Sequence, residues 1–172
     1  MFSVLVTGTN RGLGLAFVRQ LLNSAKPPVY VFAGCRTPEN AVAFLPLLRR
    51  AAKFTRSDED TMSIEKSAIV NISSMIGCIS LHKAIMTPNT PYKLSKAALN
   101  MLTSCMSIEF APDGILAVAV SPGWVQTDMG GKDIAPLTPQ ESVCKILDTL
   151  GKLKGLEASG KCYEHTGEIL SW

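Results

Sequence analysis

The sequence predicts an α/β domain in which a parallel sheet carries helices on both faces. Short apolar runs rich in β-branched residues alternate along the chain with segments of helical spacing, and a glycine-rich turn directly follows the first run. Of the 172 residues, 47% are hydrophobic and 18% are charged, which predicts a sizeable core and a single domain over residues 1–172. Sheets of this kind bind ligands beyond the carboxyl ends of their strands, so functional residues are expected there.

The expected elements follow one another in strand–helix order. Apolar strands are predicted at 2–7, 29–33, 68–72 and 115–120, with a short one near 161–163. Helices are predicted at 13–22, 41–53, 90–110 and 139–150. Pro46 favours a start of the second helix close to itself, because proline inside a helix costs about 3 kcal/mol. Thr90 is expected to cap the third helix ahead of Pro91, and Thr138 with Glu141 forms a capping box for the fourth.

Composition excludes several classes of function. The net charge is +3, with 17 Lys and Arg against 14 Asp and Glu, which leaves no dense basic patch for a nucleic acid. No apolar run reaches the roughly 20 residues that cross a bilayer, and the N-terminus lacks the basic region of a signal peptide. The five cysteines form no C-x-x-C pair, and the two histidines are too few for a zinc site. We therefore expect a cytoplasmic protein with reduced thiols and no membrane, nucleic-acid or metal partner.

The turn after the first strand reads T-G-T-N-R-G-L-G, with the spacing G-x-x-x-G-x-G. Glycines permit unusual dihedrals and let the backbone approach a pyrophosphate, while the following helix supplies free N–H groups and a partial positive charge. The alternative is a turn needed only for packing the helix on the strand. Phosphate binding is predicted for the turn residues Gly8, Asn10, Arg11, Gly12, Leu13 and Gly14.

Arg36 follows the second strand, where dinucleotide folds face the adenosine ribose. An acidic residue there would accept the ribose 2′-hydroxyl, whereas an arginine pairs with a 2′-phosphate. The sequence therefore predicts NADP rather than NAD, with an ordinary surface arginine as the alternative.

Tyr92 and Lys96 lie four residues apart, on one face of the longest predicted helix. A nearby ammonium is expected to lower the pKa of the phenol, so that the tyrosine can pass a proton near neutral pH. Ser74 closes the third strand and can hydrogen-bond a substrate oxygen. Each feature alone also has an explanation without any function: Tyr92 and Lys96 can be ordinary surface residues at helical spacing, and Ser74 can satisfy local backbone groups.

A further loop, Ser121 to Asp128, ends the fourth strand with a Pro-Gly turn. It leaves backbone groups and the hydroxyl of Thr127 free for a ligand, and a plain connecting loop is the alternative.

Taken together, these residues resemble the short-chain dehydrogenase/reductase family, and within it the sniffer-type carbonyl reductases and C-factor-like members. Gly8, Gly12 and Gly14 match the family's cofactor turn, and Ser74, Tyr92 and Lys96 match its catalytic residues. The loop that the family places beside the nicotinamide is matched by Pro122, Gly123, Val125 and Thr127. The subgroup is indicated by T-G-x-N-R-G-L-G, by the run from Tyr92 to Asn100 and by the closing Trp172.

The resemblance implies a Rossmann-like, doubly wound parallel sheet in three layers and an oxidoreductase that moves a hydride between NADP(H) and a carbonyl or alcohol substrate. Tyr92 would donate the proton, Lys96 would lower its pKa and hold the cofactor ribose, and Ser74 would orient the carbonyl oxygen. The implied partner is a small-molecule carbonyl compound, and assembly into a dimer or tetramer is left open.

One departure from the family lies between the second strand and Ser74. The family has two further strands there, an N-N-A-G turn and a helix with a catalytic asparagine, but only residues 34–66 fill this interval and no N-N-A-G occurs. The chain thus resembles a family member with an internal deletion, as in a splice variant or a mispredicted gene product. The alternative function is a catalytically impaired isoform or a non-enzymatic signalling or interaction protein.

The deletion removes the strand that the family places between strands 2–7 and 67–72. Buried backbone groups without partners cost about 1–3 kcal/mol each. We therefore expect strand 2–7 to pair directly with strand 67–72 and to narrow the cofactor cleft.

Overall fold

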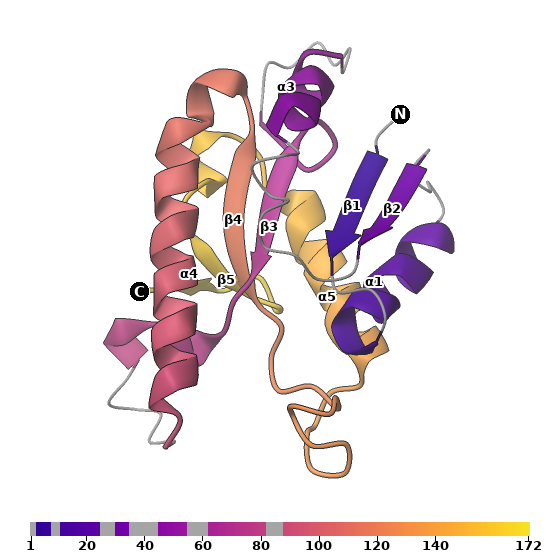
Figure 1. Cartoon of the computed structure of the whole chain (residues 1–172), viewed down its shortest axis with the longest axis vertical. Helices are drawn as coiled ribbons and strands as arrows, with labels where there is room; N and C mark the ends of the chain where they lie inside the picture. Colours follow the sequence, from indigo (N-terminus) through magenta and orange to yellow (C-terminus); the bar gives the residue numbers. More distant parts are fainter. Residues whose placement is uncertain (1–2, 8–10, 25–29, 35–44, 55–61, 82–87) are drawn as a thin grey trace.

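The computed structural model describes residues 3–7, 11–24, 30–34, 45–54, 62–81 and 88–172 (Figure 1). In chain order these form β1 (Ser3–Thr7), α1 (Gly12–Leu22), β2 (Tyr30–Gly34), α3 (Leu45–Phe54), β3 (Ala68–Ile72), α4 (Thr90–Glu109), β4 (Leu116–Ser121), α5 (Pro139–Lys152), β5 (Cys162–Glu164) and β6 (Ile169–Leu170). Short 3-10 helices occur at η1 (Met75–Gly77), η2 (Ile79–Leu81), η3 (Ala111–Asp113) and η4 (Leu156–Ala158). The predicted α/β class is confirmed, and none of the helices in these ranges is long and apolar enough to cross a membrane.

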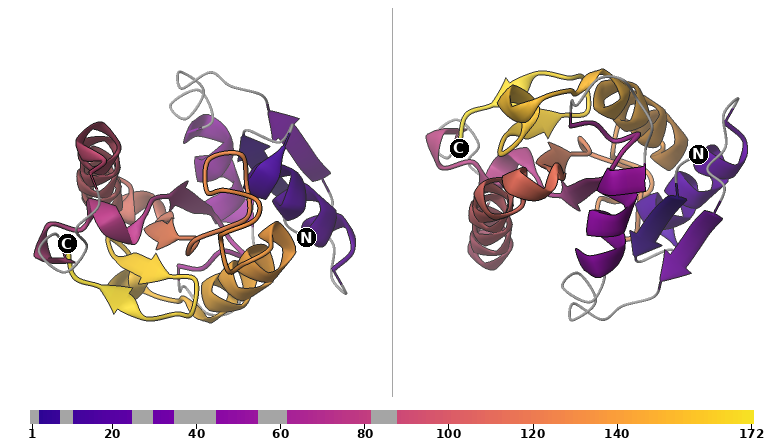
Figure 2. Two further views of the ribbon diagram at one scale, coloured as in Figure 1. Left: turned by 90° about the horizontal axis from the view of Figure 1, so that it is seen from below. Right: turned by 90° about the horizontal axis from the view of Figure 1, so that it is seen from above.

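Four strands form the main sheet, in the order β3-β4-β5-β6. The first three run parallel, with Ala68 opposite Leu116 and Ala119 opposite Cys162, whereas β6 returns antiparallel to β5 through the turn at Gly167. Helix α4 lies on one side of this sheet, and α5 and α1 lie on the other (Figures 1 and 2). The layers predicted from the sequence are therefore present, and β6 is an additional strand.

Central strand β4 is completely buried, and its two faces carry side chains of different size. Leu116, Val118 and Val120 pack into the main core cluster with residues of α1 and α5. The alternate residues Ala117 and Ala119 are small, which lets α4 approach the opposite face closely. The alternation explains how one strand supports a thick apolar core on one side and a close helix on the other.

The expected direct pairing of strand 2–7 with strand 67–72 is wrong. Within the described ranges, β1 pairs only with β2, in a separate parallel two-stranded sheet, and β3 pairs only with β4. The two sheets are joined by apolar packing instead, because Phe17 of α1 belongs to the same core cluster as Ile146 of α5 and Val6 of β1 packs against that cluster. Burial of apolar surface is non-directional and does not require continuous strand hydrogen bonds.

Helix boundaries follow the expected signals with one exception. Helix α3 begins at Leu45, directly before Pro46, as the cost of an internal proline predicts. Thr138 and Glu141 form the expected capping box, with the Thr138 N–H donating to Glu141 Oε2 at 2.8 Å. The prediction that Thr90 caps α4 is wrong by one residue: Asn89 occupies the cap position and makes no side-chain cap hydrogen bond.

Candidate active site

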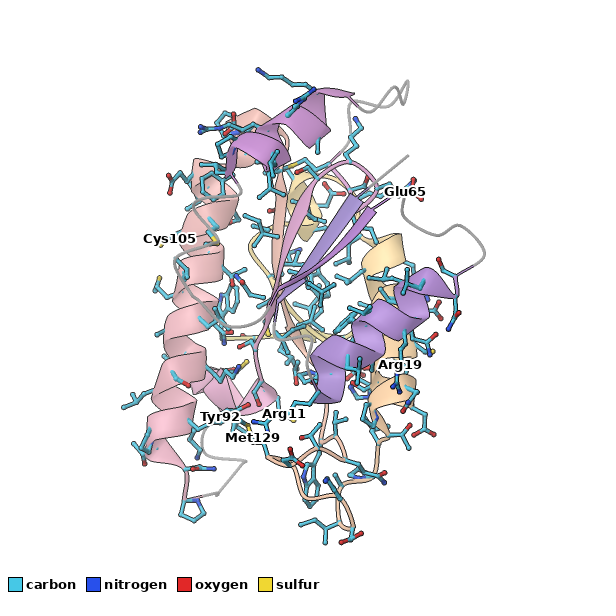
Figure 3. All side chains as sticks on the ribbon, turned by 45° about the vertical axis from the view of Figure 1, so that its right-hand side comes forward. Arg11, Arg19, Glu65, Tyr92, Cys105 and Met129 are labelled. Atoms are coloured by element: carbon cyan, nitrogen blue, oxygen red, sulfur yellow. The ribbon has the colours of Figure 1, made fainter. Side chains whose placement is uncertain are left out.

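The predicted catalytic residues lie where β3 ends and α4 begins. Ser74 follows β3 and precedes η1, while Tyr92 and Lys96 are on the first two turns of α4. Figure 3 labels Tyr92, Arg11 and Met129 at this same end of the molecule. The carboxyl end of the parallel sheet is therefore the candidate site, as its topology predicts.

Tyr92 and Ser74 are hydrogen-bonded through their side chains. Burial raises the pKa of the Tyr92 phenol above its ordinary value, and the hydrogen bond to Ser74 opposes this shift only in part. The expectation of a lowered tyrosine pKa is therefore wrong for this structure, because desolvation disfavours the phenolate more than its neighbours stabilise it. The phenol therefore stays protonated at neutral pH.

Lys96 lies beside the tyrosine and is anchored to the strand. Its Nζ is 5.5 Å from the centroid of the Tyr92 ring and donates a hydrogen bond to the Ile72 carbonyl oxygen at 2.8 Å. Burial lowers the pKa of Lys96. The hydrogen bond fixes the position of the ammonium between the strand and the tyrosine.

Buried polar contacts that the sequence analysis did not identify hold α4 against β3 and η1. Asn100 is 3% exposed, accepts a hydrogen bond from Ser73 Oγ at 2.5 Å and donates to the Gly77 carbonyl oxygen at 3.4 Å. A Cβ at Gly77 would lie 2.6 Å from the Cβ of Lys96, so only glycine permits this approach. The signal for Asn100 was its place four residues after Lys96, on the same helix face as the lysine.

The glycine turn meets the Pro-Gly loop at the start of α1. Gly12 has a φ of +54°, and a Cβ there would contact Thr127 Cγ2 at 3.5 Å. Gly123 has a φ of +76° and lies against the ring of His165. Thr127 accepts a hydrogen bond from the Gly130 N–H at 3.1 Å, while Val125 is buried. The structure thus brings Gly12 and Thr127 together, as expected for two parts of one site.

The other residues predicted to bind the cofactor are not part of the contact between Gly12 and Thr127. Leu13 packs against the core cluster, Gly14 lies within α1, and the Pro122 carbonyl accepts from Ser142 Oγ at 2.7 Å. Gly8, Asn10 and Arg36 lie outside the described residues. No group of three or more His, Cys, Asp or Glu side chains in the described ranges could hold a metal ion.

Arg11 forms an ion pair that the sequence analysis did not identify. Its guanidinium is 2.7 Å from Asp128 Oδ2, and Lys132 Nζ is 3.0 Å from Asp128 Oδ1. The hydrogen bond and charge of Lys132, followed by the charge of Arg11, lower the pKa of Asp128. The pair connects the start of α1 to the loop that follows Thr127.

Comparisons with known proteins agree with these features. The family described as short chain dehydrogenase matches residues 54–136. The mitochondrial D-beta-hydroxybutyrate dehydrogenase of Mesocricetus auratus is 30% identical over 129 residues, which cover 70% of this chain and 74% of the relative. C-signal of Myxococcus xanthus is 43% identical over 81 residues, covering 47% of this chain and 48% of the relative. The chain thus spans about half the length of C-signal, and 41% of the next curated relative.

Two solved structures are similar over nearly the whole chain. Carbonyl reductase Sniffer of Drosophila melanogaster has a TM-score of 0.86 and 29% identity, and all of both chains is covered. The NADPH-bound carbonyl reductase from chicken fatty liver has a TM-score of 0.85 and 30% identity, covering 99% of this chain and 94% of that one. The fold is therefore that of carbonyl reductases, as the resemblance implied.

Proposed function

Because the chain belongs to the short-chain dehydrogenase/reductase family, we propose that it is an oxidoreductase acting between NADP(H) and a carbonyl or alcohol substrate. The observation that carries this proposal is the placement of Ser74, Tyr92 and Lys96 side by side at the carboxyl end of β3. The NADPH-bound carbonyl reductase from chicken supports the cofactor and the substrate class.

The residues at the start of α1 fit a phosphate-bearing cofactor. Arg11 occupies the cap position without a side-chain cap hydrogen bond, and the first turn of α1 holds no acidic residue. Among the described residues, no side chain caps the first N–H groups of the helix, so these groups can bind an anion, and the helix dipole favours a negative charge there. Gly12, whose positive φ favours glycine, keeps side-chain atoms away from this position.

The bound NADPH would supply the hydride, and the protein's own residues would handle the proton. Tyr92 is protonated because burial raises its pKa, so its phenol is ready to donate to the oxygen of a carbonyl group. The Ser74 hydroxyl, which already hydrogen-bonds the phenol, would donate to the same oxygen and polarise the carbonyl. The charge of Lys96 would then stabilise the phenolate that remains.

The split sheet favours a second candidate, a family member whose catalysis is impaired. The glycine turn follows β1, whereas Ser74 and Tyr92 belong to the sheet of β3 and its covering helix, and no strand ladder joins the two within the described residues. A displaced cofactor turn would weaken hydride transfer even where all three side chains are in place, since misplacement of about 1 Å can cost on the order of 100-fold in rate.

NADPH titration and turnover with a panel of aldehydes and ketones test the two candidates. We expect saturable NADPH binding and a Tyr92→Phe variant with kcat lowered by about 10²–10⁴-fold. Ser95→Ala is the matched control for Ser74→Ala, because Ser95 is exposed on α4 and, within the described residues, its side chain donates to the Tyr92 carbonyl. Absence of NADPH binding at millimolar cofactor would establish the impaired form instead.

A further inference from the structure

A hydrogen-bonded pair of side chains, Glu164 and His165, stands at the carboxyl end of β5. Glu164 lies opposite Ser121, the first residue of the Pro-Gly loop (121–128), so the pair is at the same end of the sheet as the candidate active site. Both side chains are 12% exposed, and His165 Nδ1 donates to Glu164 Oε1 at 2.8 Å. The proposed proton transfer through Tyr92 uses neither of them.

The second oxygen of Glu164 lacks a hydrogen-bond donor. Glu164 Oε2 is buried and has no partner within the part of the chain that the structure describes. Burial, and to a smaller degree the negative charge of Glu164, raises the pKa of the nearby Cys78 and Cys162 thiols. A buried oxygen without a donor costs stability, so the position of this carboxylate is not explained by stability alone. Its hydrogen bond to the imidazole of His165 indicates where its effect lies.

The imidazole of His165 supports the turn of the Pro-Gly loop. Gly123 has a φ of +76°, and a Cβ on this residue would lie 2.9 Å from His165 Cε1 and 3.0 Å from Nδ1. The ring is therefore in contact with the backbone of Gly123, and no side chain fits between them. Because Nδ1 is also the atom that hydrogen-bonds Glu164, the carboxylate fixes the edge of the ring that faces the glycine.

Helix α5 holds the backbone on both sides of this contact. Ser142 Oγ donates to the Pro122 carbonyl at 2.7 Å, and Thr149 Oγ1 donates to the His165 carbonyl at 3.0 Å. Ser142 and Thr149 are both buried and lie about two turns apart on one face of the helix. With both backbones held in this way, the side chain of His165 determines the space that is left for the turn at Gly123.

The chain that follows Gly123 connects this contact to the start of α1. The Leu137 N–H donates to the Trp124 carbonyl at 3.2 Å, and a Cβ at Gly123 would lie 2.7 Å from Leu137 Cδ1. These contacts tie the turn to the far end of its own loop. Thr127 then reaches the start of α1, where a Cβ at Gly12 would contact its Cγ2 at 3.5 Å. A shift of Gly123 should therefore also move Thr127 relative to Gly12.

We propose that His165, oriented by Glu164, is a positioning residue that sets the place of the Pro-Gly loop and thereby the affinity for the dinucleotide cofactor. The ring acts through Gly123 on Thr127, which meets the start of α1. Both of these parts belong to the cofactor site of the proposed function, and the inference about affinity rests on that function. The placement of the loop itself can be measured without any cofactor.

Tryptophan fluorescence tests the placement of the loop. The chain contains two tryptophans, Trp124 in the loop and Trp172, so a Trp172→Phe background leaves Trp124 as the single reporter. In this background, His165→Ala should shift the Trp124 emission to longer wavelength and raise its quenching by acrylamide. Glu164→Ala should have the same effect, because it frees the ring. Glu164→Gln keeps an oxygen acceptor for the Nδ1–H group and should retain the native emission.

Calorimetric titration with NADPH in the same background tests the consequence for the cofactor. His165→Ala and Glu164→Ala should each weaken NADPH binding at least about tenfold. The double variant should bind no more weakly than His165→Ala alone, because both side chains act through the same contact with Gly123 and their effects are not additive. Glu164→Gln should bind NADPH like the parent chain.

The matched control is Glu168→Gln in the turn between β5 and β6. This variant removes an exposed carboxylate from the same hairpin and leaves the hydrogen bond from the Glu164 N–H to the Glu168 carbonyl in place. It should change neither the Trp124 emission nor the affinity for NADPH. Circular dichroism and the urea midpoint check that every variant folds. Should His165→Ala not fold, the comparison of Glu164→Ala with Glu164→Gln decides.

Three results would overturn the proposal. They are native Trp124 emission in the folded alanine variants, native NADPH affinity in these variants when the parent chain binds NADPH, and an effect of Glu164→Gln as large as that of Glu164→Ala. A parent chain that does not bind NADPH would refute the proposed function instead. In that case the expected emission shifts would still establish His165 as the residue that positions the loop.

Discussion

The two sheets of this molecule are stabilised in different ways. The sheet of β3 to β6 has a fully buried centre, is covered by helices on both faces and leads directly to Ser74 and Tyr92. The sheet of β1 and β2 has two strands, and α1 connects it to α5 through side chains such as Phe17. A two-stranded sheet is marginal by itself, so the position of Gly12 at the start of α1 depends on helix packing, whereas the position of Tyr92 depends on the main sheet.

Replacing one core residue of β4 and one of α1 by alanine should show whether the two sheets unfold separately. Leu116→Ala in β4 removes a side chain with no exposed surface and should lower the free energy of unfolding by about 2–5 kcal/mol for the whole chain. Phe17→Ala should instead unfold α1, β1 and β2 locally, while the backbone amides of β4 stay protected from hydrogen exchange. Hydrogen exchange measured by mass spectrometry distinguishes these outcomes, and equal loss of protection in both sheets would show a single cooperative unit.

The charge at the start of α1 can be tested through cofactor binding. Arg11→Ala should weaken NADPH binding by about one to two orders of magnitude, because a charge-assisted contact contributes about 1.5–3 kcal/mol. Asp128→Ala removes the carboxylate that pairs with Arg11 and should tighten binding. Calorimetric titration of both variants measures the affinity for NADPH. Unchanged affinity in Arg11→Ala would show that Arg11 does not contact a phosphate of the cofactor.

Alkaline pH should destabilise the main sheet through Cys162. Burial raises the pKa of this thiol from 9.0 to about 12, with Cys78 and Glu164 adding to the shift. The unfolded chain then loses this proton near pH 9 while the folded chain retains it, so stability falls as the pH rises from 9 to 12. Urea midpoints across this range should decline less steeply in Cys162→Ala than in the native chain, and identical slopes would exclude this thiol as a cause.

The smallest effect is expected at the capping box of α5. Thr138→Ala removes the side-chain acceptor for the Glu141 N–H and should cost about 1 kcal/mol. Because α5 packs against α1 as well as against the sheet, the loss should lower the urea midpoint of both parts together. Thr138→Ser keeps the acceptor and should remain close to the native midpoint.

Local patterns predicted the elements well because each strand and helix is determined largely by its own residues. The apolar run Leu116–Ser121 and the box at Thr138 needed no tertiary information. The relation of β1 to β3 could not be obtained in this way, since it depends on how Phe17 meets Ile146 across two helices. Strand β6 was missed because two residues carry no periodicity.

In the candidate site, too, local patterns identify some features, whereas others depend on the folded structure. Ser74, Tyr92 and Lys96 were identified from residue type and spacing, and the structure brings them together. The direction of the Tyr92 pKa shift was not predictable, because burial by the folded chain outweighs the neighbouring groups. Asp128, which pairs with Arg11, lies far from it in the sequence and has no motif of its own.

The parallel pairing of β3 with β4 also has a consequence for synthesis of the chain. Ala68 finds its partner in Leu116, so β3 leaves the ribosome well before the strand that completes its inner edge. At about 5–20 residues per second this delay lasts on the order of 2–10 s. During that interval the apolar residues of β3 are exposed on both edges, and nascent chains should associate with chaperones until α4 and β4 have followed.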